Sequence, residues 1–157
     1  MADAKSNQFE ADMLNHIFRN AAITLVGDAS GLQPSTADGD LYISLHTADP
    51  TDNCDQQGPV GGPSNEATYT GYARVAVPRN ATNWKAATSG DPTTENLLTI
   101  VFGACTVGVE TITHFVIGTD TSGTGKALYH AALSASLAVS PGITPQFAIG
   151  DLDVTEL

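Results

Sequence analysis

The sequence predicts a mainly β protein, an antiparallel β-sandwich of the jelly-roll type with one short N-terminal α-helix. Short apolar runs recur along the chain and are separated by clusters of Gly, Pro, Asp and Ser, the pattern of strands joined by turns. A helical spacing of apolar residues occurs in one stretch near the N-terminus. Because no helices lie between the predicted strands, we expect the strands to pair antiparallel in two packed sheets.

Length and charge narrow the class of protein further. A chain of 157 residues is expected to form one domain, residues 1–157. Its six basic and 17 acidic residues give a formal net charge of -11. Binding to nucleic acid requires clustered Lys and Arg, so nucleic acid is not an expected partner. We expect neither a membrane span nor a signal peptide, because no apolar run reaches about 18 residues and the N-terminus is polar.

The predicted helix covers about residues 8 to 20. Asn7 and Glu10 have the spacing of a capping box, with Asn in place of the usual Ser or Thr. The apolar residues of one stripe recur at every fourth position: Phe9, Met13 and Ile17. A single helix cannot form a bundle, so this stripe must cover a sheet or contact another subunit. If the second alternative holds, these three residues belong to an interface.

Two strands are predicted on either side of a long polar loop. Residues 41–46 alternate between apolar and polar side chains, and residues 71–78 form the second strand, which Pro78 should end. The loop between them, about residues 49–70, contains several Gly and Pro residues and is too long for a hairpin turn. Loops of this length are usually functional or mobile, so we expect this one at an exposed or partner-facing edge.

Three large side chains near the second strand are candidate interface residues. Arg74 is one of only six basic residues and shares a strand face with Tyr72. Its guanidinium could bridge a carboxylate such as Glu66, which would pin the long loop to the sheet, or it could contact a neighbouring subunit. Trp84 is the only tryptophan and either covers the core or anchors an exposed interface.

The rest of the chain is predicted to be β almost to its end. The expected strands cover residues 97–102, 112–118, 127–133, 137–139 and 147–154. In the last of them the apolar residues change face between Ile149 and Leu152, which predicts a bulge at Gly150. Together with the two earlier strands, these runs are enough for the two sheets of a sandwich.

No catalytic, metal or cofactor site is predicted. The histidines in predicted strands are His46, His114 and His130, and nothing in their spacing brings them together on a zinc ion. Cys105 lies in an apolar run, where a reactive thiolate is disfavoured, and Cys54 is expected to be a loop thiol. An acidic triplet (Asp49, Asp52 and Asp55) lacks the Gly and Glu of a calcium loop. A pair of carboxylates for glycoside hydrolysis stays open, since their separation is three-dimensional.

The order of these segments resembles that of a known group of proteins. The segments are Leu45 to Pro50, Gly71 to Arg74, Ile112 to Ile117 and Gly125 to Leu133. The chain is similar over about residues 9 to 155 to small virion structural proteins of tailed bacteriophages, of the head-decoration or tail-fibre-like kind. The resemblance implies a β-sandwich protein without catalytic activity, located in the virion and assembled in the cytoplasm of the bacterial host.

On that resemblance we expect a capsid decoration, or cement, protein. Such a protein would bind as a homotrimer across several subunits of the major capsid protein and stabilise the assembled shell, because a ligand of the assembled state alone shifts the equilibrium towards it. One alternative is a structural protein associated with the tail tip or tail fibre. The other alternative is a carbohydrate-binding jelly-roll module.

Overall fold

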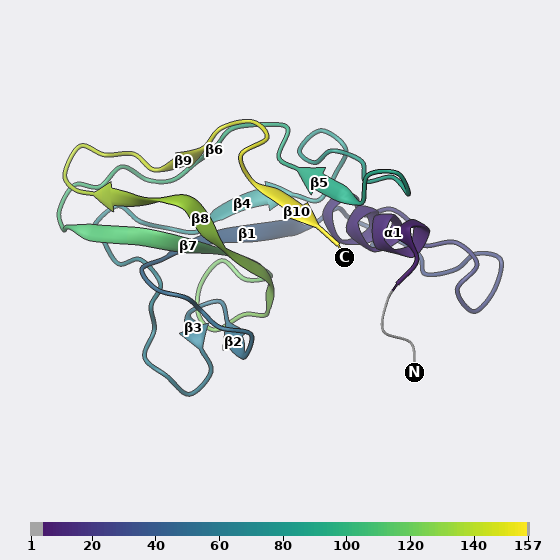
Figure 1. Ribbon diagram of the computed structural model, residues 1–157, viewed down its shortest axis with the longest axis horizontal. Helices are drawn as coiled ribbons and strands as arrows, with labels where there is room; N and C mark the ends of the chain where they lie inside the picture. The colour runs from purple at the N-terminus through teal and green to yellow at the C-terminus, as the bar shows by residue number, and fades with distance from the viewer. Residues whose placement is uncertain (1–4, 157) are drawn as a thin grey trace. The chain divides into compact units, whose positions relative to one another are not determined.

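A computed structural model describes residues 5–156 of the chain (Figure 1). Of these residues, 9% are helical and 37% are extended in β-structure, with antiparallel pairing, so the mainly β class is confirmed. The jelly-roll arrangement of two packed sheets stays a prediction. No helix in the described residues is long and apolar enough to cross a membrane. The elements are, in order, α1 (Asn7–Arg19), β1 (Asp40–His46), β2 (Cys54–Asp55), β3 (Gly58–Pro59), β4 (Val75–Pro78), β5 (Thr93–Glu95), β6 (Ile100–Val101), β7 (Glu110–Gly118), β8 (Ala127–Val139), β9 (Gln146–Phe147) and β10 (Asp153–Thr155).

The contacts of the chain divide it into two compact units, each made of separate segments. The described part of unit 1 contains residues 5–40, 78–99 and 147–156. Unit 2 contains residues 41–77 and 100–146. Each unit is described below by itself.

Unit 1 contains α1, whose two ends have clear local causes. The helix begins after Ser6, whose Oγ accepts a hydrogen bond from the backbone N–H of Phe9 at 3.4 Å. The cap is therefore one residue earlier than the predicted Asn7, which is the first helical residue. After Arg19 the chain turns at Asn20, with φ 52°, a conformation that Asn tolerates better than most residues. The helix is thus confirmed, displaced by one residue.

The core of unit 1 lies under one stripe of this helix. Ala11, Leu14 and Phe18 are buried, and the ring of Phe18 meets that of Trp84 edge-on at 4.7 Å between centroids. Edge-to-face packing of this kind adds to the stabilisation from burial alone. The stripe that packs is therefore adjacent to the predicted one. Phe9 remains exposed, while Met13 and Ile17 are half-buried.

A buried asparagine organises the C-terminal part of unit 1. The side-chain amide of Asn96 donates to the carbonyls of Leu98 and Ala148 at 2.8 and 2.7 Å, and its Oδ1 accepts from the N–H of Leu152 at 2.9 Å. The chain turns around this side chain, with Gly150 at φ 77°. The strand predicted over residues 147–154 is therefore wrong as one strand. It is divided by this turn into β9 and β10, of which β10 pairs with β5.

Unit 2 contains an antiparallel sheet with the strand order β4-β1-β7-β8. The alternation predicted for β1 is present: Leu41, Ile43 and Leu45 are buried. Ser44 and His46, on the other face, are also fully buried, at 0% exposure. Both faces of β1 are therefore buried at this end, because Asn65 of the long loop binds His46 on the polar face.

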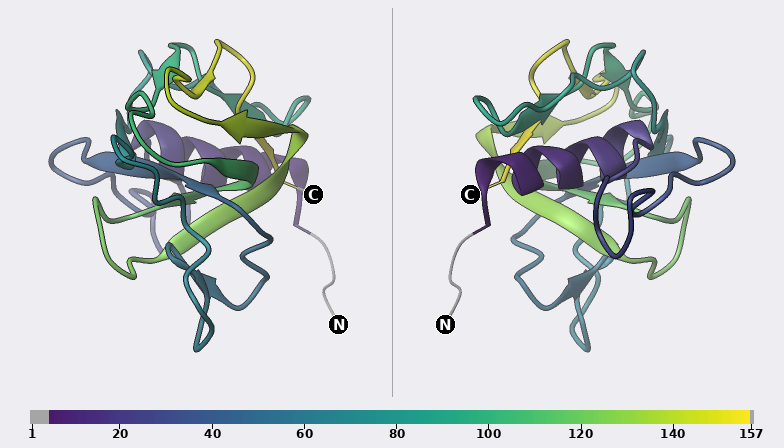
Figure 2. Two further views of the ribbon diagram at one scale, coloured as in Figure 1. Left: turned by 90° about the vertical axis from the view of Figure 1, so that its left-hand side faces the viewer. Right: turned by 90° about the vertical axis from the view of Figure 1, so that its right-hand side faces the viewer.

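Strand β8 is a single strand where two were predicted. Its register to β7 places Ala132 opposite His114 and Leu137 opposite Ile112, so residues 133–136 stand opposite Thr113 alone. This wide bulge bends β8 along its length (Figures 1 and 2). The predicted break at residues 134–136 is thus a bulge within one strand, which forms an edge of the sheet.

The loop predicted over residues 49–70 has more structure than its composition suggests. It contains the short β2–β3 pair, and its buried side chains include Gln56 at 0% exposure and Ala67 and Tyr69 at 3%. The strand after it is shorter than predicted, because only Val75–Pro78 forms β4. Tyr72 and Arg74 precede this strand and lie outside it. The loop is thus fixed along much of its length to the rest of unit 2.

Candidate functional site

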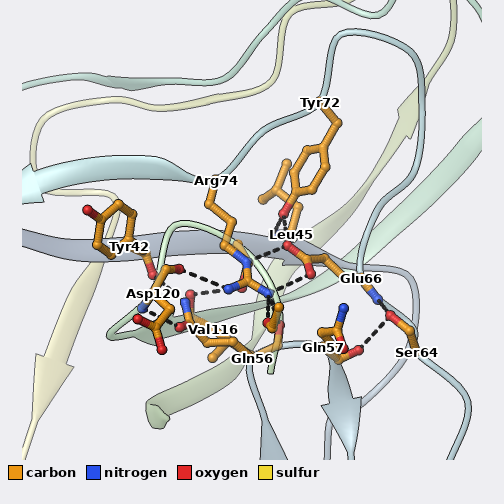
Figure 3. A network of polar contacts seen from close by, with 12 residues as sticks. Tyr42, Leu45, Gln56, Gln57, Ser64, Glu66, Tyr72, Arg74, Val116 and Asp120 are labelled. Carbon is orange, nitrogen blue, oxygen red and sulfur yellow. Dashed lines mark hydrogen bonds and ion pairs between the residues drawn. The ribbon is translucent and has the colours of Figure 1, made fainter. Parts of the chain in front are cut away.

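The densest polar cluster of unit 2 is centred on Arg74, whose side chain lies within that unit. Its guanidinium forms a bidentate ion pair with Glu66, with Nε to Oε1 at 2.7 Å and Nη2 to Oε2 at 2.8 Å (Figure 3). Paired N–H···O bonds of this kind are strong and fix the orientation of both groups. Burial opposes the charge on Arg74, but the hydrogen bond with Glu66 and the charge of this carboxylate outweigh burial and raise the pKa of the guanidinium.

The remaining N–H groups of Arg74 bind backbone carbonyls from two other segments. Nη1 donates to Asp120 O at 2.9 Å, and Nη2 donates to Gln56 O at 3.2 Å and to Gly123 O at 2.6 Å. Gln56 lies in the turn between β2 and β3, whereas Asp120 and Gly123 lie in the connection from β7 to β8. One side chain therefore holds together the long loop, the β2–β3 pair and the β7–β8 connection.

Gln56 is the second buried member of this cluster, with no exposed surface. Its Nε2 donates to Tyr42 O at 3.2 Å, and its Oε1 accepts from the N–H of Asp120 at 2.8 Å. Two glycines make room for it. A Cβ added at Gly118 would lie 2.1 Å from the Gln56 Cδ, and one at Gly125 would lie 2.3 Å from its Oε1. Gln56 was not among the predicted site residues, although the glycines on either side of residues 119–124 mark where a side chain approaches closely.

Tyr72 connects this cluster to β1. Its hydroxyl donates to Glu66 Oε1 at 2.8 Å and accepts from the N–H of Leu45 at 3.1 Å. Burial, with the nearby charge of Glu66, raises the pKa of the phenol far above its usual value, so the proton stays on the oxygen. The ring of Tyr72 stacks with that of Phe102 at 6.3 Å between centroids. Both hydrogen-bonding functions of the hydroxyl are therefore used within the unit.

A second polar chain runs through Ser44, His46 and Asn65 and has a defined proton arrangement. The Asn65 amide nitrogen donates to the carbonyls of Ala48 and Asp49 at 3.1 Å, so its Oδ1 is the atom that faces His46 Nδ1, at 2.7 Å. Because Oδ1 can only accept, the histidine proton lies on Nδ1. Nε2 then accepts from the hydroxyl of Ser44 at 3.0 Å. Burial lowers the pKa of His46, so the ring is neutral.

This arrangement has the hydrogen-bond order of a nucleophile, a base and a group that orients the base. Catalysis also requires that a substrate carbonyl reach the nucleophile. Ser44 and His46 both have 0% exposure, so no substrate can approach the hydroxyl. The chain of bonds instead fastens the loop to β1, together with the backbone bonds from Thr47 N to Asn65 O at 2.9 Å and from Ala67 N to Leu45 O at 2.8 Å.

Comparison with known proteins assigns the chain to a family. Residues 4–155 match the model of the family described as Podophage GP4 fiber I protein gp80. The chain belongs to this family. It is a bacteriophage virion structural protein, and the resemblance to virion proteins of tailed phages is confirmed. No curated protein matches the chain.

Membership of the fibre family distinguishes between the two virion roles considered above, capsid decoration and association with the tail fibre. The family is one of phage fibre structural proteins, which favours the tail-fibre alternative over the expected capsid decoration role. In this fibre-family chain, the ion pair expected between Arg74 and Glu66 is present. Tyr72 contacts the same carboxylate, so the structure brings two of the predicted site residues together in unit 2.

The other predicted site residues of this fibre-family chain lie in unit 1. Phe9, Met13 and Ile17 follow one another along α1, beside the stripe that packs into the unit, and Phe9 is 38% exposed. Trp84 is fully buried against Phe18, as expected of a side chain that covers the core. Its Nε1 has no hydrogen-bond partner among the described residues.

The titratable residues considered for metal binding are distributed through unit 2. No group of three or more His, Cys, Asp or Glu side chains suited to a metal ion occurs within residues 5–156. His46 binds Asn65 and Ser44, and His130 lies 3.6 Å from Asp52 and 4.0 Å from Asp49 at the surface. Cys105 is buried at 1% exposure, and burial with nearby acidic residues raises the pKa of the Cys54 thiol.

Proposed function

We propose that the chain is a structural subunit of the tail fibres of a bacteriophage, or of a tail part attached to them, and that it acts by assembly rather than by catalysis. The observation that carries this proposal is the match of residues 4–155 to a fibre protein family. The interior chemistry supports it. The side chains that resemble a catalytic chain, Ser44, His46 and Asn65, are occupied in fixing a loop, and two of them have no exposed surface.

We propose that the subunit forms a homotrimer. Closed rotational symmetry gives each subunit the same contacts and limits the assembly to a fixed number of copies, which suits a component of a particle. The second apolar stripe of α1 supports contact with another subunit. Phe9 is exposed and Met13 and Ile17 are half-buried, while the neighbouring stripe already fills the core of unit 1.

Two other functions expected from the sequence have no specific observation in their favour. Decoration of the head would require the major capsid protein as partner, and the family match names a fibre protein instead. A carbohydrate-binding module would require exposed aromatic or polar groups arranged around a sugar. The largest aromatic residue, Trp84, is buried, and Tyr72 is bonded to Glu66.

Immunogold labelling of purified virions tests the proposal. An antibody against the recombinant chain should label the tail or its fibres, and mass spectrometry of the same virions should detect the chain. An antibody against the major capsid protein serves as the control for head labelling. Label over the heads would select the decoration function, and absence of the chain from virions would overturn both structural roles.

A further inference from the structure

Charged residues are unevenly distributed along the chain. It contains six basic and 17 acidic residues, yet only Glu110, Asp120 and Lys126 lie between residues 97 and 150. Among the segments of unit 2 without Asp, Glu, Lys or Arg are residues 104–109 and residues 127–143, the second of which includes β8. We call these two segments the uncharged edge.

The two segments of the uncharged edge lie side by side. The N–H of Cys105 donates to Ile143 O at 2.8 Å, and the N–H of Gly142 donates to Cys105 O at 2.9 Å. Val139 is paired with Glu110, the residue that follows the first segment. The carboxylate of Glu110 is itself bound to Thr68, with 3.0 Å from the N–H to Oε1. The two segments are thus joined at Cys105 and Ile143, while the acidic side chains of Asp49 and Asp52 lie beside His130, nearer the start of β8.

Strand β8 forms most of this surface and lacks the usual protection of an edge strand. It ends the order β4-β1-β7-β8, and within residues 5–156 no strand pairs with its outer side. Edge strands are normally kept from pairing with other chains by short length, charged side chains or Pro. The opposite edge, β4, has four residues and ends in Pro78. By contrast, β8 has 13 residues and contains no Pro, Asp, Glu, Lys or Arg.

Apolar side chains at the end of this surface are open to solvent. Val107 is 64% exposed, Val109 is 80% exposed and Ile143 is 39% exposed. Single exposed apolar residues are common, but these three lie in two segments that are bonded to each other at Cys105 and Ile143, and exposed apolar groups of this kind favour an interaction site. Along β8 the exposed residues are short: Ala131, Ala132, Ser134, Ala135, Ser136 and Ala138. Short side chains allow another backbone to approach closely.

We propose that the uncharged edge of unit 2 packs against a second copy of this chain. The net charge of -11 makes copies of the chain repel one another wherever their acidic surfaces meet. Contact through the uncharged edge avoids this repulsion, and the cores of protein interfaces are depleted of charge in the same way. A basic partner would gain most from the acidic surface elsewhere, so the neutral surface fits an identical copy better. The inference rests on the proposed function, because it names a second surface, besides the apolar stripe of α1, through which fibre subunits associate.

The bulge in β8 limits how far such pairing can extend. Residues 133–136 interrupt the register to β7, and the bend prevents β8 from presenting one flat ladder along its whole length. Flat, regular edges promote open-ended stacking of strands, whereas a bent edge favours a contact of limited extent. The geometry is therefore compatible with a closed oligomer of few copies.

Three substitutions by glutamate test the proposal with matched charge. Ala135→Glu and Val109→Glu place a carboxylate on the uncharged edge at exposed positions, so neither change disturbs the core. Val60→Glu is the control, because Val60 is 55% exposed in the same unit but lies outside the edge. Analytical ultracentrifugation over a concentration series gives the state of association of each protein. Circular dichroism and thermal unfolding check that each variant is folded.

The wild type and Val60→Glu should associate equally. The two edge variants should need about tenfold higher concentration or more to do so, since like charges are then brought together in the contact. Edge variants that associate as well as Val60→Glu, or a wild type that stays monomeric at every concentration, would overturn the inference. Labelling of virions then decides the proposed function separately. A chain located on the tail but monomeric in solution would retain the fibre function and lose this interface.

Discussion

Asn65 determines which nitrogen of His46 carries the proton. The amide of Asn65 is oriented by two backbone carbonyls, those of Ala48 and Asp49, so its oxygen faces His46 Nδ1 at 2.7 Å. His46 Nε2 in turn accepts a hydrogen bond from the hydroxyl of Ser44. Asn65 of the loop thus selects the tautomer of His46 in β1. The same hydrogen bond holds the loop against the strand.

The stability of the protein should decrease as the pH falls through the range in which histidine titrates. Burial lowers the pKa of His46 below its usual value of 6.5, so the unfolded chain takes up a proton at a higher pH than the folded chain does. The contribution of His46 is complete above pH 6.5 and is lost progressively as the pH falls towards the folded-state pKa. Urea unfolding between about pH 5.5 and 7.5 measures this slope.

Two variants separate His46 from the other histidines. His46→Gln should reduce the dependence of the unfolding free energy on pH in this range. His130→Gln, which changes a histidine beside Asp52 and outside the buried chain of Ser44, His46 and Asn65, is the matched control. A slope that survives in His46→Gln would assign the pH dependence to other groups.

Replacing Arg74 by Ala should strongly destabilise unit 2. The change leaves the Glu66 carboxylate and three carbonyl groups without their partner, and breaking a buried ion pair costs about 3–5 kcal/mol. Lys85→Ala is the control, since Lys85 forms an exposed ion pair with Asp91 at 3.2 Å. Chemical denaturation should show a clear decrease in the free energy of unfolding for Arg74→Ala and no measurable decrease for Lys85→Ala. Equal effects in the two variants would mean that the buried network contributes no more than a surface pair.

Gly118→Ala should destabilise the protein through Gln56. The new Cβ would lie 2.1 Å from the Gln56 Cδ, so the buried amide must move and lose hydrogen bonds. Overpacking of this kind typically costs about 1–3 kcal/mol. Gly90→Ala is the matched control, because a Cβ at Gly90 meets no atom within 4 Å. If both variants unfold at the same temperature, the space around Gln56 is not restricted.

The two faces of α1 should respond differently to truncation. Phe18→Ala removes a buried ring that packs against Trp84 and should cost about 3–5 kcal/mol. Phe9→Ala changes an exposed residue and should leave the unfolding free energy nearly unchanged. If the Phe9 stripe contacts another subunit, the same Phe9 variant should weaken the homotrimer. Light scattering with size-exclusion chromatography measures that second effect, and an unchanged trimer would remove the stripe from the interface.

Features with a local cause could be predicted from the sequence. The alternation of Leu41, Ile43 and Leu45 located β1, and the four-residue spacing of apolar residues located α1 within one residue of its ends. The pairing of Arg74 with Glu66 could also be predicted, because the chain has few basic residues and these two lie eight positions apart. The family resemblance in turn indicated a virion protein.

Features with distant partners could not be predicted. Gln56 contacts Asp120, which is 64 positions away, and its role depends on how the β7–β8 connection folds back onto the β2–β3 turn. The bulge in β8 was read as a gap between strands, because small polar residues such as Ser134 and Ser136 occur in turns and in bulges alike. The prediction of one continuous strand over residues 147–154 was wrong because Asn96, far upstream, provides the hydrogen bonds that turn the chain there.

The hydrogen bonds of Arg74 determine the order in which parts of unit 2 can fold while the chain is being synthesised. Its carbonyl partners at Asp120 and Gly123 leave the ribosome almost fifty residues after the arginine itself. Until then the nascent chain can join Arg74 to Glu66 and Gln56, but it cannot complete the set of bonds that fixes the loop. The loop therefore reaches its final conformation only after the connection that follows β7 has emerged, although the loop itself is synthesised much earlier.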